Sequence, residues 1–288
     1  MQSISELRKQ IRGIASTQKI TNAMKMVAGA RFNKALSLMH NTQTFHNELK
    51  VTFDAISSVL EPPSSKRKLI SVSDTIPEDR IGIIVMTGDK GLCGDFNTSI
   101  LKEANRFFVD KGNSVKAGFG VGRKASNFIR STGLTVKSEY PLVTTGIEFA
   151  FADKIGREIL SAFATEDLSS IVCVSSRFHS MGKRSVTATP LLPLIAKKKE
   201  TTTDLLIEPL DSDEVFAAMI PLLFKAQIFS LLQENYVSEL SARIRAMDNA
   251  TTNAGVIIDQ ITLEMNKARQ ASITREIAEI IGTNEVIK

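Results

Sequence analysis

The chain has 288 residues, of which 43% are hydrophobic and 23% charged, and its net charge is +5. This composition is ample for a folded core, and the two cysteines, Cys93 and Cys173, are too few for a disulfide framework and suggest a reducing compartment. No apolar run approaches the roughly 18 residues that a membrane-spanning helix needs, so we expect any membrane association to come through another protein.

The charge is distributed unevenly along the chain. Residues 1–40 contain seven Lys or Arg against one acid, whereas residues 211–288 contain seven against eleven acids. A basic helix could attract nucleic acid, an anionic membrane surface or an acidic protein surface. The chain has no Trp, and both tyrosines lie away from the basic segment, which disfavours nucleic acid. The opposite signs of the two ends favour their pairing with each other.

The N-terminal segment is predicted to form one long helix. It opens with the capping-box pattern Ser3-Ile-Ser-Glu6 and contains no proline from Ser3 to about Ser58. The helix is expected to end before Pro62-Pro63. At about 1.5 Å per residue it would be a rod of roughly 84 Å, much longer than an average globular helix. A rod of this length indicates a partner that it has to reach.

Residues 69–208 alternate between strand and helix patterns. Strands are predicted from β-branched apolar runs, and helices from the longer segments between them. The predicted strands are residues 81–87, 115–121, 171–176 and 186–189, the predicted helices are residues 98–111, 124–131 and 147–165, and residues 197–203 are a polar connection. This alternation predicts a central Rossmann-like α/β domain with a mainly parallel sheet and helices on its faces.

A second long helix is predicted from Asp211 to about residue 284. Its start, Asp211-Ser-Asp-Glu214, is acidic and suits the positive end of a helix. Pro221 should kink this helix or split it into two pieces. From residue 222 to 281 the only glycine is Gly255, and proline is absent.

Both terminal helices carry apolar residues in steps of three or four, the spacing of a coiled-coil seam. The C-terminal seam consists of Phe229, Leu232, Tyr236, Leu240, Ile244, Met247, Ala250, Ala254, Ile258, Ile261, Met265 and Ala268. The N-terminal seam consists of Ile4, Leu7, Ile11, Ile14, Gln18, Thr21, Lys25, Ala28, Phe32, Ala35 and Met39, with a polar middle. Because both helices attach to the same domain, we expect them to run antiparallel as a coiled coil.

Some apolar residues fall outside the seams. Ile20, Met24 and Val27 point to another face of the N-terminal helix. The C-terminal helix is expected to exceed its partner by up to about 20 Å, which would leave an isoleucine-rich end without an intrachain partner. A two-helix coil hides only one seam on each helix, so these residues predict an enclosing protein.

The sequence gives little support to catalysis by this chain. His40, His46 and His179 lack metal-ligand spacing, and neither a phosphate loop of the Walker type nor a nucleophile elbow is present. We therefore expect no catalytic, cofactor or metal site.

Two groups of glycines follow predicted strands. Gly118, Gly120 and Gly122 have the spacing G-x-G-x-G, which indicates tight-turn glycines better than a dinucleotide site. The segment from Gly88 to Gly94 could be a phosphate-binding turn, but a loop that permits close backbone approach is the preferred interpretation.

Three stretches resemble the signature stretches of the F-type ATP synthase gamma subunit. They are ITNAMKMVAGARFNKA at residues 20–35, TGDKGLCGDFN at 87–97 and ATTNAGVIIDQITLEMNKARQASITREIAEIIG at 250–282. Asp95 and Phe96 stand where the family commonly has Gly and Leu. The cysteine-bearing regulatory insertion of chloroplast relatives is absent, so the resemblance is to the bacterial type.

The resemblance implies a fold and a function. Residues 1–60 and 211–284 would form an antiparallel coiled coil inside a ring of alpha and beta chains, and residues 69–208 would form a central domain touching epsilon and the membrane ring of c subunits. One such chain would serve each complex, which also contains delta. It would couple proton-driven rotation to ATP synthesis or hydrolysis and regulate ATPase activity, without a catalytic site of its own. It would lie on the cytoplasmic face of the bacterial cell membrane, held there through the c ring only.

The resemblance also implies roles for residues of the terminal helices. Arg269 and Gln270 match positions that hydrogen-bond a loop of a beta chain near the tip. Met24 and Lys25 match the region facing an acidic loop of beta, although Lys25 could equally pair with an acid of the C-terminal helix.

Two further groups are assigned in the same way. The apolar tip against the ring would consist of Ile273, Ile277 and Ile280. The architecture of the lower domain would include Gly91, Leu92, Cys93 and Gly94, with a weaker case for a role at the foot of the rotor.

Two other classes of function stay open on the residues alone. The α/β domain could be a nucleotide-dependent enzyme with helical arms, in which case the isolated chain should bind a nucleotide tightly. Alternatively, the chain could be a coiled-coil scaffold unrelated to rotation.

Overall fold

The computed structural model describes residues 3–64, 68–71, 79–141, 146–196 and 211–286. The chain divides into two compact units. The helix-pair unit comprises Met1–Gly29 and Arg243–Lys288, and the sheet unit comprises Ala30–Ala242. Two long terminal helices, α1 (Ile4–Val59) and α5 (Ser212–Val286), contribute to both units.

The starts of both terminal helices are capped as the sequence predicts. The Ser3 backbone N–H donates to Glu6 Oε2 at 3.0 Å, and the Glu6 N–H donates to Ser3 Oγ at 3.2 Å. These reciprocal bonds satisfy two of the N–H groups that a helix start leaves without partners. At the start of α5, the Asp213 N–H donates to Asp211 Oδ1 at 3.0 Å.

Helix α5 continues through Pro221, so the predicted split is wrong. Proline removes one backbone hydrogen bond and is unfavourable inside a helix. Its neighbours Phe216, Ile220 and Leu223 are almost completely buried in the core of the sheet unit. Burial of a large apolar side chain contributes about 1.5–3 kcal/mol, so several of them outweigh the missing bond and hold the helical path.

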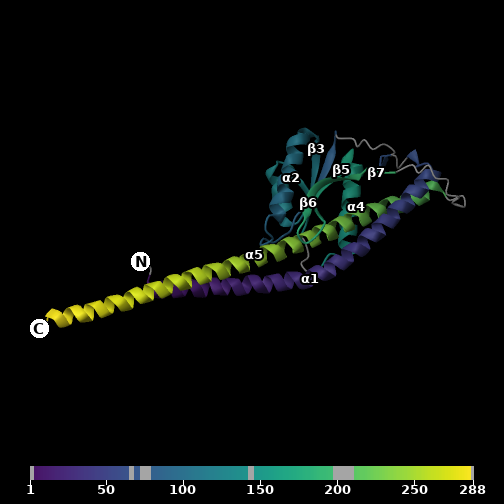
Figure 1. Ribbon diagram of the computed structural model, residues 1–288. Coiled ribbons are helices and arrows are strands. Elements are labelled where there is room, and N and C mark those ends of the chain that lie inside the picture. The colour runs from purple at the N-terminus through teal and green to yellow at the C-terminus, as the bar shows by residue number, and fades with distance from the viewer. Residues whose placement is uncertain (1–2, 65–67, 72–78, 142–145, 197–210, 287–288) are drawn as a thin grey trace. The chain divides into compact units, whose positions relative to one another are not determined.

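In the helix-pair unit, α1 and α5 run antiparallel, as predicted (Figure 1). Thr21 lies opposite Thr251, with their hydroxyl oxygens 2.8 Å apart, and Lys25 lies opposite Asp248. Every predicted seam position in this unit is buried or half-buried, from Ile4 to Ala28 on α1 and from Ile244 to Ala268 on α5. The seam prediction is therefore confirmed here.

The sheet unit contains a five-stranded sheet in the order β4-β3-β2-β5-β6. All neighbours are parallel except β5 and β6, which form an antiparallel pair. The strands are β2 (Ile81–Met86), β3 (Val115–Val121), β4 (Val136–Tyr140), β5 (Ser170–Phe178) and β6 (Arg184–Leu192). A separate small parallel pair joins β1 (Ile70–Ser71) to β7 (Leu194–Ile195).

The connecting helices are α2 (Phe96–Lys111), α3 (Arg123–Ser131) and α4 (Phe149–Thr165), with a 3₁₀ turn, η2 (Gly112–Ser114), after α2. All four predicted strands and all three predicted helices of this region are confirmed to within a few residues. The sequence missed β4 and the pair β1–β7. The predicted connection at residues 197–203 lies outside the described residues. The division of the chain at residues 60, 69, 208 and 211 stays a prediction.

Helices cover both faces of the sheet. Strand β2 is fully buried, and its side chains alternate between the two faces. Ile84 and Met86 join a core cluster with α4 and the first part of α5, which also buries Phe53 of α1. Ile83 and Val85 join a second cluster with α2 and α3.

Helix α5 is more apolar than the sequence analysis predicted. Among the described residues, α5 contains an 18-residue window that is apolar enough to cross a membrane by length and composition alone. The prediction that no run approaches this limit is therefore wrong. Half of the window is buried inside the fold, however, and the core helix of a soluble protein passes the same test. The apolar residues in question are largely those of the sheet-unit core.

Candidate functional site

The C-terminal part of α5 extends past the start of α1 within the helix-pair unit. The pairs Thr21–Thr251 and Lys25–Asp248 fix the antiparallel register. By this register Ile4 faces the neighbourhood of Ala268, and no described residue of α1 lies opposite the residues that follow. The backbone of α5 continues as helix to Val286, which is about 27 Å beyond Ala268 at 1.5 Å per residue.

This overhanging segment exposes apolar side chains together with polar ones. Ile273 is 49% exposed and Ile277 52%, and Arg269 and Gln270 are also exposed. The side chain of Ile280 lies outside the described residues. An isoleucine-bearing helix end without an intrachain partner has the chemistry of an interaction surface, because exposed apolar area is stabilised by burial against a partner.

A polar layer lies in the middle of the helix pair. Lys25 Nζ is 2.6 Å from Asp248 Oδ1, and Gln18 Nε2 donates to the Thr251 carbonyl at 3.3 Å. Of the two roles open for Lys25, the structure therefore realises the pairing with an acid of α5. Both side chains are substantially exposed, so the pair contributes only about 0–1 kcal/mol. Met24 beside it is half-buried.

Apolar residues outside the seams are exposed along the helix pair. On α1 these include Ile20 and Val27, as predicted, and on α5 they include Val256, Ile257 and Leu263. They lie on faces that the two-helix contact leaves uncovered. The helix-pair unit thus presents apolar side chains along its length as well as at its tip.

The loop after β2 is organised by Asn97 of α2. Its Oδ1 accepts the Gly88 N–H at 2.8 Å, and its Nδ2 donates to the Lys90 carbonyl at 3.3 Å and to Cys93 Sγ at 3.2 Å. Asn97 is 4% exposed, and Cys93 is also buried. One buried amide therefore holds both ends and the middle of this loop.

The loop presents Leu92 to solvent in an unusual backbone conformation. Leu92 has a φ of 60° and is 61% exposed, although a large side chain is rarely found in the left-handed region. Gly94 has a φ of 58°, which glycine tolerates easily. A Cβ at Gly91 would meet nothing within 4 Å. Of the four predicted residues, only Cys93 lies in the core.

The acidic residues of this loop are occupied within the chain. Asp89 Oδ1 accepts the Arg123 N–H at 2.8 Å, and the Asp95 carboxylate forms an ion pair with Arg184. The hydrogen bond from Arg184 lowers the pKa of Asp95. Both carboxylates therefore serve contacts within the chain.

The crevice where α/β sheets usually bind ligands is filled by α5. Ligands bind such sheets at the carboxyl ends of the strands where the strand order reverses, here between β2 and β5. At this edge the Ser176 N–H of β5 donates to Asn235 Oδ1 at 3.0 Å. A Cβ on Gly88 would lie 2.7 Å from a carboxylate oxygen of Glu239. Asn235 and Glu239 are both buried, so no room is left here for a nucleotide.

The glycines of β3 serve the packing of α3. A Cβ on Gly118 would lie 2.5 Å from Ile129 Cγ2, and one on Gly120 would lie 2.4 Å from Ser126 Oγ. Gly122 has a φ of 88° and lies against the Thr87 carbonyl. The tight-turn interpretation thus holds for Gly122. The other two glycines instead permit close contact between a strand and a helix.

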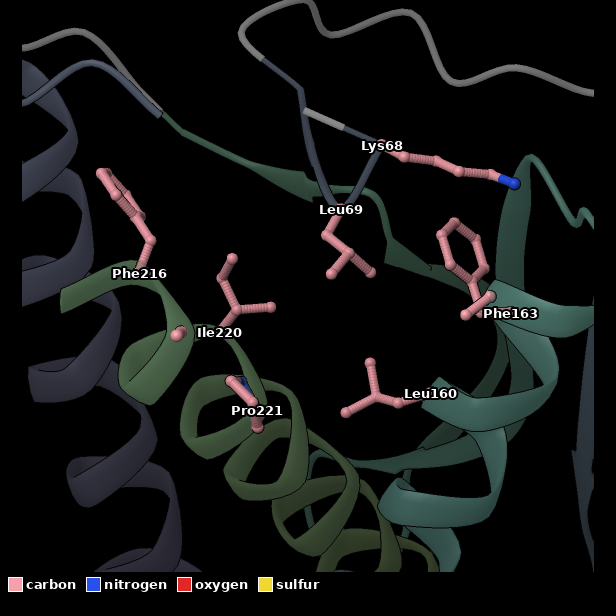
Figure 2. Close-up of a pocket in the computed structure, with 9 residues that line it drawn as sticks. Lys68, Leu69, Leu160, Phe163, Phe216, Ile220 and Pro221 are labelled. Atoms are coloured by element: carbon pink, nitrogen blue, oxygen red, sulfur yellow. The ribbon is translucent and has the colours of Figure 1, made fainter. Parts of the chain in front are cut away.

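An apolar pocket of about 260 Å³ lies in the sheet unit at the start of α5. In Figure 2, side chains of α4, α5 and the segment before β1 surround a common space, and Lys68 extends along its rim. Lys68 Nζ lies 5.5 Å from the centroid of the Phe163 ring and 2.6 Å from Asp167 Oδ1. The pocket therefore offers apolar contact but no group arranged for acid–base or nucleophilic chemistry.

Potential metal ligands and buried titratable groups were also compared with what a metal site or a reactive site requires. In the part of the chain that the structure describes, no group of three or more His, Cys, Asp or Glu side chains is arranged to hold a metal ion. Burial raises the pKa of the Cys173 thiol to about 12, so the thiol stays protonated and unreactive. Burial, with a hydrogen bond to Glu158, also raises the pKa of Tyr140.

Sequence reasoning missed the buried polar residues of α5 in the sheet unit. Glu234 and Asn235 interact with the end of β5. The signal was present in LLQENYVSEL (231–240), where polar residues stand among apolar ones on a helix that the structure buries on almost every side. A buried polar residue in such a position needs a partner, but the sequence does not say which one.

Fold and surfaces together define the class of this protein: an α/β domain that lies in sequence between two long terminal helices, which pair antiparallel and expose apolar side chains. The family described as ATP synthase matches residues 3–287, and the chain belongs to this family. Curated relatives are ATP synthase gamma chains. That of Halothermothrix orenii is 34% identical over 297 residues, and that of Sorangium cellulosum is 32% identical, each match covering 100% of both chains. That of Pelagibacter ubique is 33% identical and covers 99% of each chain.

Solved structures share the fold. One match is a chain in a structure of the Euglena gracilis mitochondrial ATP synthase that contains OSCP, F1 and the c-ring. Its TM-score is 0.67 and its sequence identity 19%, and the match covers 99% of this chain and 94% of that chain. A chain from the central stalk and c-ring of the Tetrahymena thermophila enzyme matches with a TM-score of 0.60 and 23% identity, covering 80% of this chain and 99% of its own. At this identity the likeness concerns the fold.

Proposed function

We propose that this chain is the central rotor shaft, the gamma subunit, of an F-type ATP synthase. It couples proton-driven rotation of the c ring to ATP synthesis or hydrolysis in the alpha and beta chains. The observation that carries the proposal is the helix pair with uncovered apolar residues along its sides and at its tip, such as Val27, Leu263 and Ile273. Such a rod requires an enclosing partner, and membership of the gamma-chain family supports a ring of alpha and beta chains in that role.

The proposal assigns contacts to the helix-pair unit. Arg269 and Gln270 would hydrogen-bond a beta chain, and the apolar tip of Ile273, Ile277 and Ile280 would lie against the ring. Met24 and Lys25 would face the acidic loop of beta. Since Lys25 already pairs with Asp248, its contact with beta would be a shared one that attracts without locking.

The sheet unit would form the foot of the rotor. Residues 91–94 would belong to the architecture of this foot, and the exposed Leu92 would be the member that meets epsilon or the c ring. Residues 69–208 would form the central domain between coiled-coil segments 1–60 and 211–284. Delta would also be a subunit of the complex. The chain would lie on the cytoplasmic face of the bacterial membrane, attached through the c ring.

Catalysis would belong to the beta chains. The absence of room in the crevice between β2 and β5 supports this, because α5 side chains fill the place where a nucleotide would bind. The same feature disfavours the nucleotide-dependent enzyme. A non-rotary scaffold would need the exposed tip to bind a static partner, and no feature of the chain favours that alternative over rotation.

The composition of the native complex tests the proposal. The chain, tagged in its own cell, should purify with alpha and beta chains in about threefold excess over itself, measured by native mass spectrometry. Ile273→Asp together with Ile277→Asp should weaken this association, because charge is placed on the apolar tip. Lys102→Glu on the exposed face of α2 is the matched control. Recovery of the wild-type chain only as a free homodimer would contradict the proposal.

A further inference from the structure

The end of β5 contacts both terminal helices inside the sheet unit. From α5, Asn235 Oδ1 accepts the Ser176 N–H at 3.0 Å, and Glu234 Oε1 accepts the Phe178 N–H at 3.2 Å. From α1, the ring of Phe32 lies edge-to-face against that of Phe178, with centroids 5.7 Å apart. Two residues at the end of one strand, Ser176 and Phe178, thus contact two helices that are far apart in sequence.

Two further links complete this arrangement, which we call the anchor cluster. Arg177 Nη1 is 2.6 Å from Glu234 Oε2, and Ser241 Oγ donates to the Met181 carbonyl at 3.0 Å. The cluster consists of Phe32, residues 176–178, Met181, Glu234, Asn235 and Ser241. Its α5 members are buried, with Glu234 5% exposed and Asn235 2%.

The position of the cluster distinguishes it from general core packing. The apolar cores restrain the helices by close packing of interdigitated side chains. Hydrogen bonds to backbone N–H groups of a central strand also limit rotation of a helix about its own axis, since they weaken steeply away from a linear geometry. Phe32 and Ser241 also lie within three residues of the points where α1 and α5 leave the sheet unit.

We propose that the anchor cluster fixes the rotational angle of the two shaft helices on the sheet, so that torque passes from the foot to the shaft at this point. The inference rests on the proposed rotor function and adds positioning residues to it. Glu234 is the central one, because its carboxylate binds both the Phe178 N–H and the Arg177 guanidinium at the end of β5. Loss of Glu234 makes the rotor torsionally softer without removing any catalytic group.

The test measures torsional stiffness in the assembled complex. The alpha and beta chains are held on a surface, and a bead is attached through Lys102→Cys on α2, which is exposed while both native cysteines are buried. With the head stalled by a non-hydrolysable nucleotide, the angular variance of the bead reports stiffness. Glu234→Ala removes both links made by this carboxylate, so the variance should rise above that of the wild-type complex. The ATP hydrolysis rate should be retained.

Matched variants separate the cluster from ordinary stabilisation. Gln233→Ala removes a buried hydrogen bond, 2.7 Å long, from α5 to the carbonyl of Ile147, which lies before α4 and not in a strand of the sheet. It should therefore raise the variance less than Glu234→Ala does. Glu234→Gln keeps one acceptor and should give an intermediate variance. It also decides the matter if Glu234→Ala fails to fold.

The outcomes are distinct. Unchanged variance in Glu234→Ala, or in Glu234→Gln when only that variant folds, overturns the inference while the rotor function stands. An equal rise in Gln233→Ala also overturns it, because the stiffness would then depend on any buried polar link of α5 and not on the anchor cluster. A wild-type complex that hydrolyses ATP without rotating the bead removes the proposed function, and the inference with it.

Discussion

Asn97→Ala should destabilise the sheet unit and loosen the loop that presents Leu92. The substitution leaves the Gly88 N–H without its acceptor in a buried place, which costs about 1–3 kcal/mol. The Lys90 carbonyl lies in an exposed residue and can bind water, so its loss adds little. We therefore expect a loss of about 2 kcal/mol, equivalent to a fall of about 4–8 °C in Tm for a unit of this size.

Thermal unfolding and amide hydrogen exchange measure the two effects. Exchange should rise most in residues 88–95, and in β3 and β5 it should rise only as far as the loss of global stability requires. Asn97→Asp should recover part of the Tm, because a carboxylate still accepts the Gly88 N–H but no longer donates to the Lys90 carbonyl. The matched control is Asn127→Ala, at an exposed position of α3. Equal Tm and equal loop exchange in Asn97→Ala and wild type would refute the reasoning.

Three other predictions follow from single contacts. Gly29→Ala should raise the free energy of unfolding by about 0.5–1 kcal/mol, measured by denaturant titration. Gly29 lies inside α1, where alanine is favoured over glycine, and a Cβ there would meet nothing within 4 Å. A loss of stability would contradict this prediction. The hydrogen bond from Arg184 lowers the pKa of Asp95 in the folded state, so wild type should have a higher Tm than Asp95→Asn at pH 7. This difference in Tm should disappear as the pH falls below 3.8, the ordinary pKa of the carboxyl, and through its lower folded pKa. A difference that grows on acidification would contradict the prediction. Truncation before Arg269 should weaken ATP-driven ion pumping and leave the sheet unit folded by circular dichroism, because the removed segment belongs to the helix-pair unit; unfolding of the sheet unit would be the contrary result.

The elements that the sequence predicted are those with strong local signals. The run at 81–87 is β-branched and bounded by glycine, and it forms the central strand β2. The seams of α1 and α5 depend on spacing alone, and the structure buries them as expected. By contrast β4, with the sequence VKSEY, is short and carries charges on an edge strand, so neither its composition nor its length indicates a strand.

Contacts set by tertiary structure could not be predicted in the same way. The helix signal predicts that α5 continues past residue 230, but it does not identify Ser176 and Phe178 as partners of Asn235 and Glu234. Those partners are backbone N–H groups and leave no trace in residue type. Lys25 had two candidate partners of equal merit, and only the register of the helix pair selects Asp248. The split predicted at Pro221 is wrong because the burial of its neighbours outweighs the local effect of the proline.

Rotation driven by ATP is the most direct test of the central claim that this chain is a rotor shaft. The complex is held through its beta chains, and a bead is attached to the sheet unit through Lys102→Cys. On addition of ATP the bead should turn in one direction through complete revolutions, at a rate set by the ATP concentration. Continued ATP hydrolysis with only random angular fluctuation of the bead would contradict the account.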